Sequence, residues 1–492
     1  MKSLGQSVIS NSSLLGGVKI IEKSLGLVSI LILARILTPE DFGVVAIVMI
    51  FIFFFETVGY AGGEQYLIQK TVVDNDDINS AFTLNLGTKI VLFLLLIALV
   101  PYISDFYKNP DLTNVLYFAS SILLIRSVAN PGLALLKKSL DFRLIAKATL
   151  YTKLITFVAV LTLAYFTQSY WALIIADVLN VVIFTIATYI IHPYRPKPCV
   201  KKIREQFNFS QWIFLRSTIG FIRSQGDRII VSKLFAANLM GEFHMARNLA
   251  SLPSQDIILP ATEPLLSSFS KVKDNTEKLI YQFTLSILIV SCLVLPISSF
   301  IYFHSDLIVA ILLGSQWVHA SSILSGLSPL VATAVLGSIL GQVCIAKNKP
   351  AVLFGYDIVS FIITLSILLI FSDLYIGDFA LLKSTIEITC FIAFLFYIST
   401  LLSFNPLRTI AEILLITLFS VAAGYISSHI QMDNMNIVLK IVLFFFIFSF
   451  FYLALLLLFH YTIYKKTQQG MHIHYLVKHN FHKASKRIFK HN

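Results

Sequence analysis

Long runs of hydrophobic residues, separated by short polar interruptions, fill most of the chain. A helix needs about 20 largely apolar residues to cross the hydrocarbon core of a bilayer. Irregular backbone cannot face lipid, so spans of this kind are helical. We therefore predict an all-α polytopic membrane protein with about 14 transmembrane helices. The stretches that meet the requirement are approximately 16–37, 42–62, 80–102, 115–137, 148–167, 171–192, 210–236, 241–264, 279–303, 321–346, 350–371, 377–402, 408–428 and 437–461.

The composition supports a membrane environment. Hydrophobic residues make up 57% of the 492 residues and charged residues only 13%, whereas soluble domains carry about 25% charged residues. The four cysteines are scattered without C-x-x-C spacing, which favours neither a disulfide framework nor a metal site. The first residues contain no pattern typical of a cleaved signal peptide. We expect no metal ion and no cofactor.

The basic residues in the connections lie on one side of the predicted membrane. If the N-terminus is cytoplasmic, Lys108 is the only Lys or Arg in the links on the opposite side, which carry acidic residues instead. Cytoplasmic loops of membrane proteins are rich in Lys and Arg, so we predict an even number of spans with both termini cytoplasmic. This asymmetry also accounts for much of the net charge of +12, and a nucleic-acid partner is not needed to explain it.

A basic connection divides the predicted spans into two groups. We assign residues 1–192 to an N-terminal six-helix bundle and residues 193–209 to a basic cytoplasmic linker. Residues 210–402 form a C-terminal six-helix bundle, and residues 403–461 form two additional transmembrane helices. Residues 462–492 form a basic, His-rich cytoplasmic tail, for which contact with anionic headgroups is favoured over metal binding.

The two bundles share a local pattern at the end of their first helices. Arg35 precedes Gly43 by eight positions, and Lys233 precedes Gly241 by eight, at a constant offset of 198 residues. In the first copy, Thr38 has the position of an N-cap and is followed by proline and two acidic residues. The pattern favours two pseudo-symmetric bundles in the same orientation, as in transporters with parallel repeats.

The first helix of the second bundle carries more charge than a lipid-facing helix tolerates. A centred Arg, Lys or Asp costs about 2.5–3.5 kcal/mol on insertion scales, so these side chains are expected to face protein or water. One face of this helix, with positions i, i+4, i+7 and i+11, contains Arg216, Gly220, Arg223 and Asp227. Arg228 borders this stripe. With three guanidinium groups and one carboxylate, this helix has a net positive charge.

Other predicted spans also contain ionisable residues. Lys19 and Lys23 share one face of the first helix, with Glu22 beside them. Further charges in or at the ends of spans are Glu56, Arg126, Lys153, Asp177 and Glu263. The predicted interruptions of the helices are at Asn130–Pro131, Pro260 and Pro264. Two interpretations stay open: buried ion pairs that fix the helix register, or a cationic cavity that binds an anionic ligand. The cavity is favoured for the arginines, because acidic partners on the same helix are too few.

The motifs of several enzyme classes are absent from the sequence. It contains no G-x-x-x-x-G-K-[ST] loop, no H-E-x-x-H and no G-x-S-x-G. The soluble stretches between spans are too short for a separate catalytic domain. We therefore predict that the protein is not an enzyme.

Residues 33–70, "LARILTPEDFGVVAIVMIFIFFFETVGYAGGEQYLIQK", resemble the first-to-second-helix signature of the bacterial polysaccharide transporters. These are the oligosaccharide-flippase (Wzx-like) branch of the multidrug/oligosaccharidyl-lipid/polysaccharide exporter superfamily. Residues 226–253 resemble the counterpart in the second half. The resemblance implies two bundles around a central cavity in the bacterial inner membrane. It implies ion-coupled alternating access for an undecaprenyl-diphosphate-linked oligosaccharide, in O-antigen, capsule or exopolysaccharide synthesis.

This resemblance gives the charged residues candidate roles. A diphosphate or anionic glycan is expected to meet Arg216, Arg223, Arg228, Lys19, Lys23, Arg126 and Lys153, and the candidates for ion coupling or charge pairing are Glu22, Glu56, Asp177 and Asp227. Expected partners are membrane lipids, a glycan polymerase and a chain-length regulator. The alternatives are a multidrug or cation exporter of the same superfamily, a membrane-embedded glycan polymerase or ligase, and a scaffold protein of a glycan-assembly complex.

Overall fold

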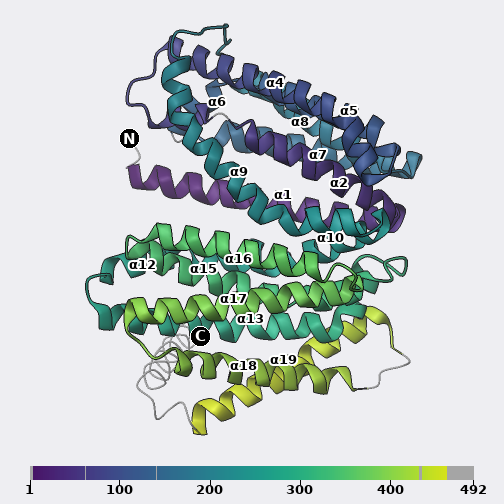
Figure 1. Cartoon of the computed structure of the whole chain (residues 1–492), viewed down its shortest axis with the longest axis vertical. Coiled ribbons are helices and arrows are strands. Elements are labelled where there is room, and N and C mark those ends of the chain that lie inside the picture. Colours follow the sequence, from purple (N-terminus) through teal and green to yellow (C-terminus); the bar gives the residue numbers. More distant parts are fainter. Residues whose placement is uncertain (1–3, 61, 140, 431–434, 463–492) are drawn as a thin grey trace, which may run out of the picture. The chain divides into compact units, whose positions relative to one another are not determined.

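The computed structural model describes residues 4–60, 62–139, 141–430 and 435–462. Within these ranges the side chains of residues 4–16, 209–216, 223–224 and 458–462 lie outside the description. The described residues form helices joined by short links and contain no β-strand, which confirms the all-α prediction. They group into two compact units, Met1–His244 and Met245–Asn492, coloured purple to teal and green to yellow in Figure 1.

The first unit consists of long helices and two short ones. Within it α2 packs against α5 and α9, α4 against α5, and α7 against α1 and α8. The helices are α1 (Leu4–Ile36), α2 (Pro39–Val58), α3 (Gly63–Gln69), α4 (Asn75–Tyr107), α5 (Asp111–Ser127), α6 (Gly132–Lys138), α7 (Arg143–Thr167), α8 (Trp171–Ile191) and α9 (Ile203–Leu234), followed by α10 (Ala237–Ser251), in which the two units divide.

The helix pattern agrees with a protein that crosses the membrane many times. Ten helices of the described residues are long and apolar enough to span a bilayer, and the pair α5 and α6, bent by 60°, gives an eleventh. The other predicted spans correspond to α1, to α9 and to α10 with the two helices after it. These three segments are helical as well, and they contain several charged residues or prolines.

The start of α2 shows how local sequence fixes one end of the first unit. Thr38 Oγ1 accepts a hydrogen bond from the Asp41 backbone N–H at 3.3 Å, and Asp41 Oδ2 accepts one from the Thr38 N–H at 2.9 Å. This capping box, with Pro39 at the first helical position, satisfies backbone donors that the helix leaves unpaired. Asp41 Oδ1 also accepts a hydrogen bond from the Tyr170 N–H at 2.9 Å, which attaches the turn between α7 and α8 to α2.

The two glycines of the repeat pattern meet each other in the first unit. A Cβ atom added to Gly43 would lie 1.7 Å from the carbonyl oxygen of Ala237, and one added to Gly241 would lie 1.8 Å from the carbonyl oxygen of Pro39. The backbones of α2 and α10 therefore approach so closely that only glycine fits at either position. This packing gives a physical reason for the glycine in each copy.

The second unit is built around α13. An apolar cluster from η1, α12, α13, α15 and α17 forms its main core, and a second cluster joins α13 to α18 and α19. Its helices are η1, a π-helix (Leu252–Ile258), α11 (Leu259–Thr262), α12 (Pro264–Val272), α13 (Thr276–Leu312), α14 (Ala320–Leu327), α15 (Leu330–Ala346), α16 (Pro350–Ile370), α17 (Ile376–Leu402), α18 (Pro406–Ser428) and α19 (Ile437–Thr462).

Prolines mark the helix irregularities that the sequence predicts. The break between α5 and α6 lies at Asn130–Pro131, and α11 and α12 begin around Pro260 and Pro264. A proline removes a backbone donor and clashes with the preceding turn, so a continuous helix is interrupted there. The predicted interruptions are confirmed.

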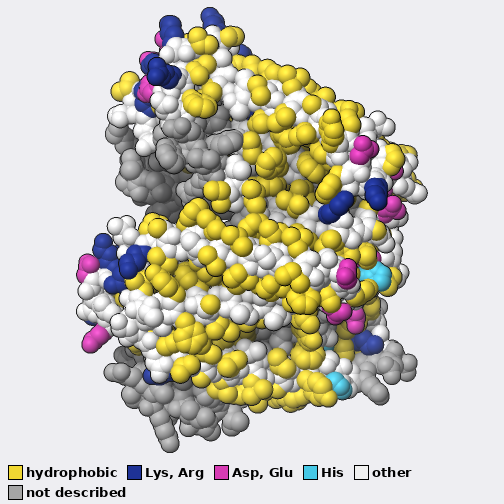
Figure 2. All heavy atoms as spheres, viewed as in Figure 1, with side chains coloured by type: hydrophobic (Ala, Val, Ile, Leu, Met, Phe, Trp, Pro, Cys, Tyr) yellow, Lys and Arg dark blue, Asp and Glu magenta, His cyan; other side chains and the backbone are white. Residues whose placement is uncertain are grey.

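The surfaces of both units are apolar along the flanks of their helices. On the face shown in Figure 2, hydrophobic side chains cover the middle of the helices, and charged side chains gather near helix ends. Exposed large hydrophobic residues include Leu94 on α4, Val158 on α7, Leu414 on α18 and Phe446 on α19. Such surfaces are stable in lipid, and the chain is a multi-pass integral membrane protein.

Candidate functional site

A pocket with charged side chains in its walls lies within the first unit, with a volume of about 290 Å³. Ligand pockets usually measure about 300–1,000 Å³, so it suits a small polar group. Its walls come from α2, α3, α4, α5 and α6 and from the links between α2 and α3 and between α5 and α6. The lining residues used below are Glu56, Glu64, Leu67, Ala81, Lys89 and Arg126.

Two cations and one carboxylate from three different helices meet in this pocket. Lys89 Nζ of α4 lies 2.8 Å from Glu56 Oε1, and Arg126 Nη1 of α5 lies 2.7 Å from Glu56 Oε2. Lys89 is almost fully buried, whereas half of the Arg126 side chain is exposed. The carboxylate compensates for the buried cation, and the three groups together keep a net charge of +1.

Arg126 has further capacity for hydrogen bonding. Among the described residues its side chain donates only to Glu56, while a guanidinium group carries five N–H donors. An anion that enters the pocket can therefore contact Arg126 without first displacing Glu56. A third cation, Lys137 of α6, is paired with the pocket residue Glu64 at 2.6 Å.

Asn130 holds the break between α5 and α6 in place. Its Nδ2 donates to the carbonyl oxygens of His192 at 3.0 Å and Tyr194 at 2.9 Å. Its Oδ1 accepts from the Gly132 N–H at 2.9 Å. The bond from Gly132 satisfies a backbone group that the interrupted helix leaves unpaired. The bonds to His192 and Tyr194 attach the break to the chain after α8 and position the part of the pocket wall that carries Arg126.

Two of the three charged residues in this pocket are predicted from the sequence, and the third is not. Glu56 and Arg126 were predicted site residues, and the structure brings them together. Lys89 was missed, although a lone Lys between Thr88 and a long apolar run is an intramembrane cation and such residues mark functional sites by default. The same rule also identifies Lys383, which is buried in α17 of the second unit.

The other predicted residues do not line this pocket. On α1, Lys19 and Lys23 are exposed and Glu22 is partly buried. Lys153 on α7 is partly buried, whereas Asp177 on α8 is exposed. Their roles stay predictions.

The charged stripe on α9 is described only in part. The side chains of Arg216 and Arg223 lie outside the described residues. Asp227 is buried, and Arg228 Nη1 donates to Gln225 Oε1 at 3.0 Å. The predicted meeting of the three arginines with a phosphate therefore stays a prediction.

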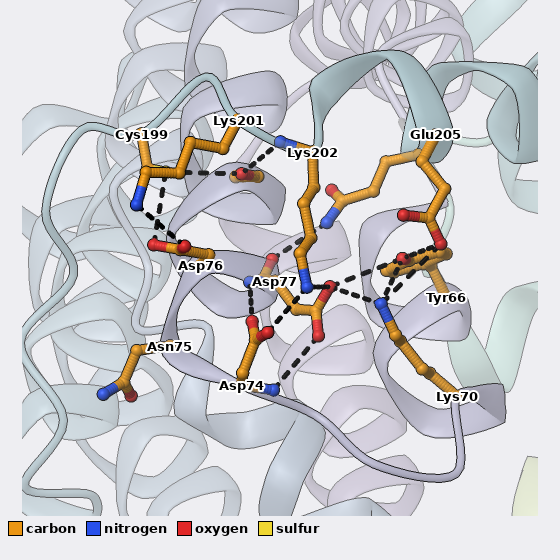
Figure 3. Close-up of polar contacts among 12 residues, drawn as sticks. Tyr66, Lys70, Asp74, Asn75, Asp76, Asp77, Cys199, Lys201, Lys202 and Glu205 are labelled. Atoms are coloured by element: carbon orange, nitrogen blue, oxygen red, sulfur yellow. Dashed lines mark hydrogen bonds and ion pairs between the residues drawn. The ribbon is translucent and has the colours of Figure 1, made fainter.

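A second polar cluster lies at the start of α4 (Figure 3). Lys202 Nζ lies 2.6 Å from Asp74 Oδ2 and 3.1 Å from Asp77 Oδ1. Lys70 Nζ lies 2.7 Å from the same oxygen of Asp77. The Asp77 side chain is only 1% exposed, so two lysines neutralise one buried carboxylate.

These contacts shift the pKa values of the groups in the links. The hydrogen bond from Lys202 lowers the pKa of Asp74 to about 2, because it stabilises the carboxylate. The hydrogen bonds to Asp74 and Asp77 raise the pKa of Lys202, and the hydrogen bond to Asp77 raises that of Lys70. All three groups are therefore charged at neutral pH.

The chain matches a family of known proteins. A family model described as "Polysaccharide biosynthesis protein" matches residues 32–322, which is more than half of the chain. The chain is 22% identical over 364 residues to the lipopolysaccharide biosynthesis protein WzxC of Escherichia coli, covering 72% of this chain and 73% of that protein. It is also 22% identical over 325 residues to the succinoglycan biosynthesis transport protein ExoT of Rhizobium meliloti, covering 66% of this chain and 64% of that protein.

Solved structures share the fold. The chain superposes on the lipid II flippase MurJ with a TM-score of 0.71 and 14% identity, over 89% of this chain and 97% of that chain. A transporter of the multidrug resistance MATE family gives a TM-score of 0.58 and 14% identity, over 77% of this chain and 95% of that chain. The two-bundle fold and the family predicted from the sequence are confirmed. The chain belongs to the polysaccharide biosynthesis protein family.

Proposed function

We propose that this protein is a flippase for a lipid-linked oligosaccharide. It would move an undecaprenyl-diphosphate-linked repeat unit from the cytoplasmic to the periplasmic leaflet by alternating access. The family, the many apolar helices and the fold it shares with a lipid II flippase support this function. The relatives are named for biosynthesis and transport of surface polysaccharides, which favours transport over catalysis.

The observation that carries the proposal is the pocket with Lys89, Glu56 and Arg126. The lipid-linked donor carries a diphosphate, and two cations against one carboxylate leave positive charge to attract it. Arg126 is half exposed, and a guanidinium group binds phosphate through two parallel hydrogen bonds. Glu56 keeps the cations compensated when no phosphate is present.

The cations predicted elsewhere extend this proposal. Arg216, Arg223 and Arg228 on α9, Lys19 and Lys23 on α1, and Lys153 on α7 would bind the anionic glycan or the diphosphate at other points of its path. Ion coupling would fall to Glu22, Glu56, Asp177 or Asp227. Among these, Glu56 is the carboxylate paired with two cations in the described residues. A polymerase and a chain-length regulator stay predicted partners.

The pocket argues against the alternative of a cation exporter. A cationic drug would meet Lys89 and Arg126, whose charge exceeds that of Glu56, while the other lining carboxylate, Glu64, is already paired with Lys137. Like charges raise the free energy of binding, so a cationic substrate is disfavoured at this site. The relatives reported above are named for polysaccharide biosynthesis and transport. None of these names favours the alternatives of a glycan polymerase or ligase or of a scaffold protein.

Transport by purified protein in lipid vesicles tests the proposal. The substrate is undecaprenyl-diphosphate oligosaccharide, and the variants are Arg126→Ala, Arg126→Lys and Lys89→Met. A hydrogen bond to a charged group contributes about 1.5–3 kcal/mol, so Arg126→Ala and Lys89→Met should slow translocation by about 10- to 100-fold. Arg126→Lys should retain part of the rate.

Lys201→Met is the matched control, because it removes an exposed cation from the same unit. It should transport at the wild-type rate. Wild-type rates in both Arg126→Ala and Lys89→Met, at equal amounts of folded protein, would refute the pocket as the phosphate site.

A further inference from the structure

The linker between the predicted bundles lies along the first turns of α4. The backbone N–H groups of Lys197, Cys199 and Lys202 donate to side chains of Asn79, Thr83 and Ser80 at 2.9, 2.8 and 3.2 Å. Gln206 Nε2 donates to the Asp77 carbonyl oxygen at 2.9 Å. We call residues 194–206 the linker strap. Its register on α4 is fixed by polar bonds that recur along its length.

Ion pairs fasten the linker strap to the start of α4, and a hydrogen bond connects it to α3. Lys202 bridges Asp74 and Asp77, and Figure 3 shows its amine between the two carboxylates. Tyr66 Oη of α3 donates to Glu205 Oε1 at 2.6 Å, and Lys70 Nζ donates to Tyr66 Oη at 2.9 Å. The strap is thus held to α3 by Tyr66 and to the start of α4 by Asp77, whose carboxylate is buried.

The elements under the strap are also walls of the pocket that contains Lys89, Glu56 and Arg126, which we call the cation pocket after its two basic residues. Glu64 and Leu67 of α3 line the pocket, whereas Tyr66 of the same helix and Lys70, which follows its last residue, contact the strap or its partner Asp77. On α4, Ala81 lines the pocket one helical turn after Asp77.

An apolar cluster fills the space between pocket and strap. Tyr66, Leu67, Ile78, Ala81 and Ala134 form this cluster, and Tyr194 of the strap packs against it. Closely packed side chains transmit displacement because they leave little free volume. A shift of α3 at the strap therefore moves the pocket wall.

We propose that the linker strap is a positioning device for the cation pocket, and that strap closure and lipid-diphosphate binding are coupled. The proposal rests on the proposed function. Lys202 and Tyr66 act through α3 and α4, and they are positioning residues with no contact to the ligand. The strap ends in the first turn of α9, so occupation of the pocket would alter the anchoring of the chain that begins the second predicted bundle.

Coupling between two sites is reciprocal. If strap closure raises the affinity of the pocket for a ligand, the ligand favours strap closure by the same factor. Two measurements on the same protein can therefore check each other: lipid affinity in strap variants, and strap closure with and without lipid.

Cys199 is a native reporter of strap closure. Its Sγ lies 3.6 Å from Ser80 Oγ and 3.8 Å from Asp76 Oδ1, and it is partly buried. The other cysteines are Cys292, Cys344 and Cys390, and replacing them with Ala leaves Cys199 as the only thiol. Its rate of reaction with a membrane-impermeant maleimide then measures opening of the strap.

The experiment compares four substitutions in this single-cysteine background. Lys202→Met keeps the aliphatic stem and removes the charge, and Lys202→Arg keeps the charge. Tyr66→Phe removes only the hydroxyl group, which tests the strap if Lys202→Met does not fold. Lys201→Met is the control within the strap. The Lys201 side chain is 70% exposed, against 26% for Lys202, and an exposed ion pair contributes little to stability. Affinity is measured for undecaprenyl diphosphate in detergent micelles.

Coupling free energies usually correspond to factors of about 5–150. In Lys202→Met, and to a smaller degree in Tyr66→Phe, the maleimide should label Cys199 at least about fivefold faster than in the wild type. Both variants should also bind undecaprenyl diphosphate at least about fivefold more weakly. Lys202→Arg and Lys201→Met should match the wild type in both measurements. Undecaprenyl diphosphate should slow labelling of the wild type and should do so much less in Lys202→Met.

The outcomes separate this proposal from the proposed function. If the wild type binds undecaprenyl diphosphate and folded Lys202→Met and Tyr66→Phe bind it equally well, the coupling is refuted and the flippase function stands. If Cys199 is labelled in Lys202→Met and Tyr66→Phe at the same rate as in Lys201→Met, the contacts of Lys202 and Tyr66 do not hold the strap closed and the proposal is refuted. If the wild type does not bind undecaprenyl diphosphate, the proposed function fails, even where Lys202→Met still labels faster.

Discussion

At the scale of single residues, the buried Lys89 sets the chemistry of the pocket. An isolated ammonium group in an apolar interior is strongly disfavoured, so Lys89 requires the carboxylate of Glu56 at 2.8 Å. Arg126 shares the same carboxylate from the exposed side. Removing any one charge changes how the other two are compensated.

A double-mutant cycle on Lys89 and Glu56 should reveal this dependence. Lys89→Met leaves Glu56 with Arg126, whereas Glu56→Gln leaves Lys89 buried beside a neutral amide. Groups in direct contact couple by about 0.5–3 kcal/mol. The double variant should therefore lose less free energy of unfolding than the two single variants lose in sum. SDS-induced unfolding of purified protein measures the free energies.

The control cycle combines Glu56→Gln with Lys201→Met, which shares no contact with it in the described residues. These two losses should add. Additive losses for Lys89 and Glu56 as well would contradict the ion pair.

The depressed pKa of Asp74 predicts how the strap responds to acid. Its carboxyl has an ordinary pKa near 3.8 and a folded-state pKa of about 2. Its contribution to stability is therefore complete above about pH 4 and is lost as the pH falls from 3.8 toward 2. The difference in thermal unfolding midpoint between wild type and Asp74→Asn should be constant from pH 5 to 8. It should shrink in buffers near pH 3. A difference that already changes between pH 5 and 8 would show that another group titrates with the strap.

The sequence predicts which residues carry charge in the membrane, but it does not predict their partners. Glu56 and Arg126 were identified as costly residues in apolar spans, and that reasoning needs no structure. Their distance of 2.7 Å depends on the packing of α2 against α5, which is set by many apolar contacts. The contacts of the strap could not be predicted from the sequence either, because Lys202 and Asp77 are far apart in the chain and each has the pattern of an ordinary charged residue in a loop.

At the scale of elements, the crossing of α2 and α10 depends on two glycines. Gly43 and Gly241 allow contacts between backbone atoms that any Cβ would prevent. We expect Gly43→Ala or Gly241→Ala to abolish the folded protein or to lower its yield severely, because the obstructing atoms are backbone carbonyls that cannot rotate away. Size-exclusion chromatography of the detergent-solubilised protein measures the folded fraction.

Gly87→Ala provides the matched comparison on α4, where an added Cβ would meet nothing within 4 Å. Alanine is a better helix former than glycine by about 1 kcal/mol, so this variant should be as stable as the wild type or more so. A normal yield of Gly43→Ala would show that α2 and α10 do not pack so closely.

Element boundaries were predictable wherever the signal is local. The N-cap at Thr38 and the breaks at Pro131, Pro260 and Pro264 follow from the residues themselves. The short helix α3 was not predicted, because the seven residues Gly63–Gln69 follow directly on a predicted span and have no apolar periodicity of their own. It is nevertheless the element that joins the pocket to the strap.

At the scale of the whole molecule, the distribution of basic residues orients the chain in the membrane. The strap contributes Lys197, Lys201 and Lys202 to the side predicted to be cytoplasmic, whereas Lys108 belongs to the link between α4 and α5 on the other side. α4 separates the two sites, and its 33 residues are long enough to cross a bilayer. A reagent that cannot cross membranes should therefore reach Cys199 and position 108 from opposite sides.

Two single-cysteine proteins test this orientation. One keeps only Cys199, and the other lacks all native cysteines and carries Lys108→Cys. In intact spheroplasts the impermeant maleimide should label position 108 and spare Cys199, and in inverted membrane vesicles the pattern should reverse. Because positively charged loops are retained in the cytoplasm, the reverse pattern would require the strap to be translocated with its lysines. That result would remove the basis for a pocket that loads substrate from the cytoplasmic leaflet, and labelling of both positions from one side would contradict the span formed by α4.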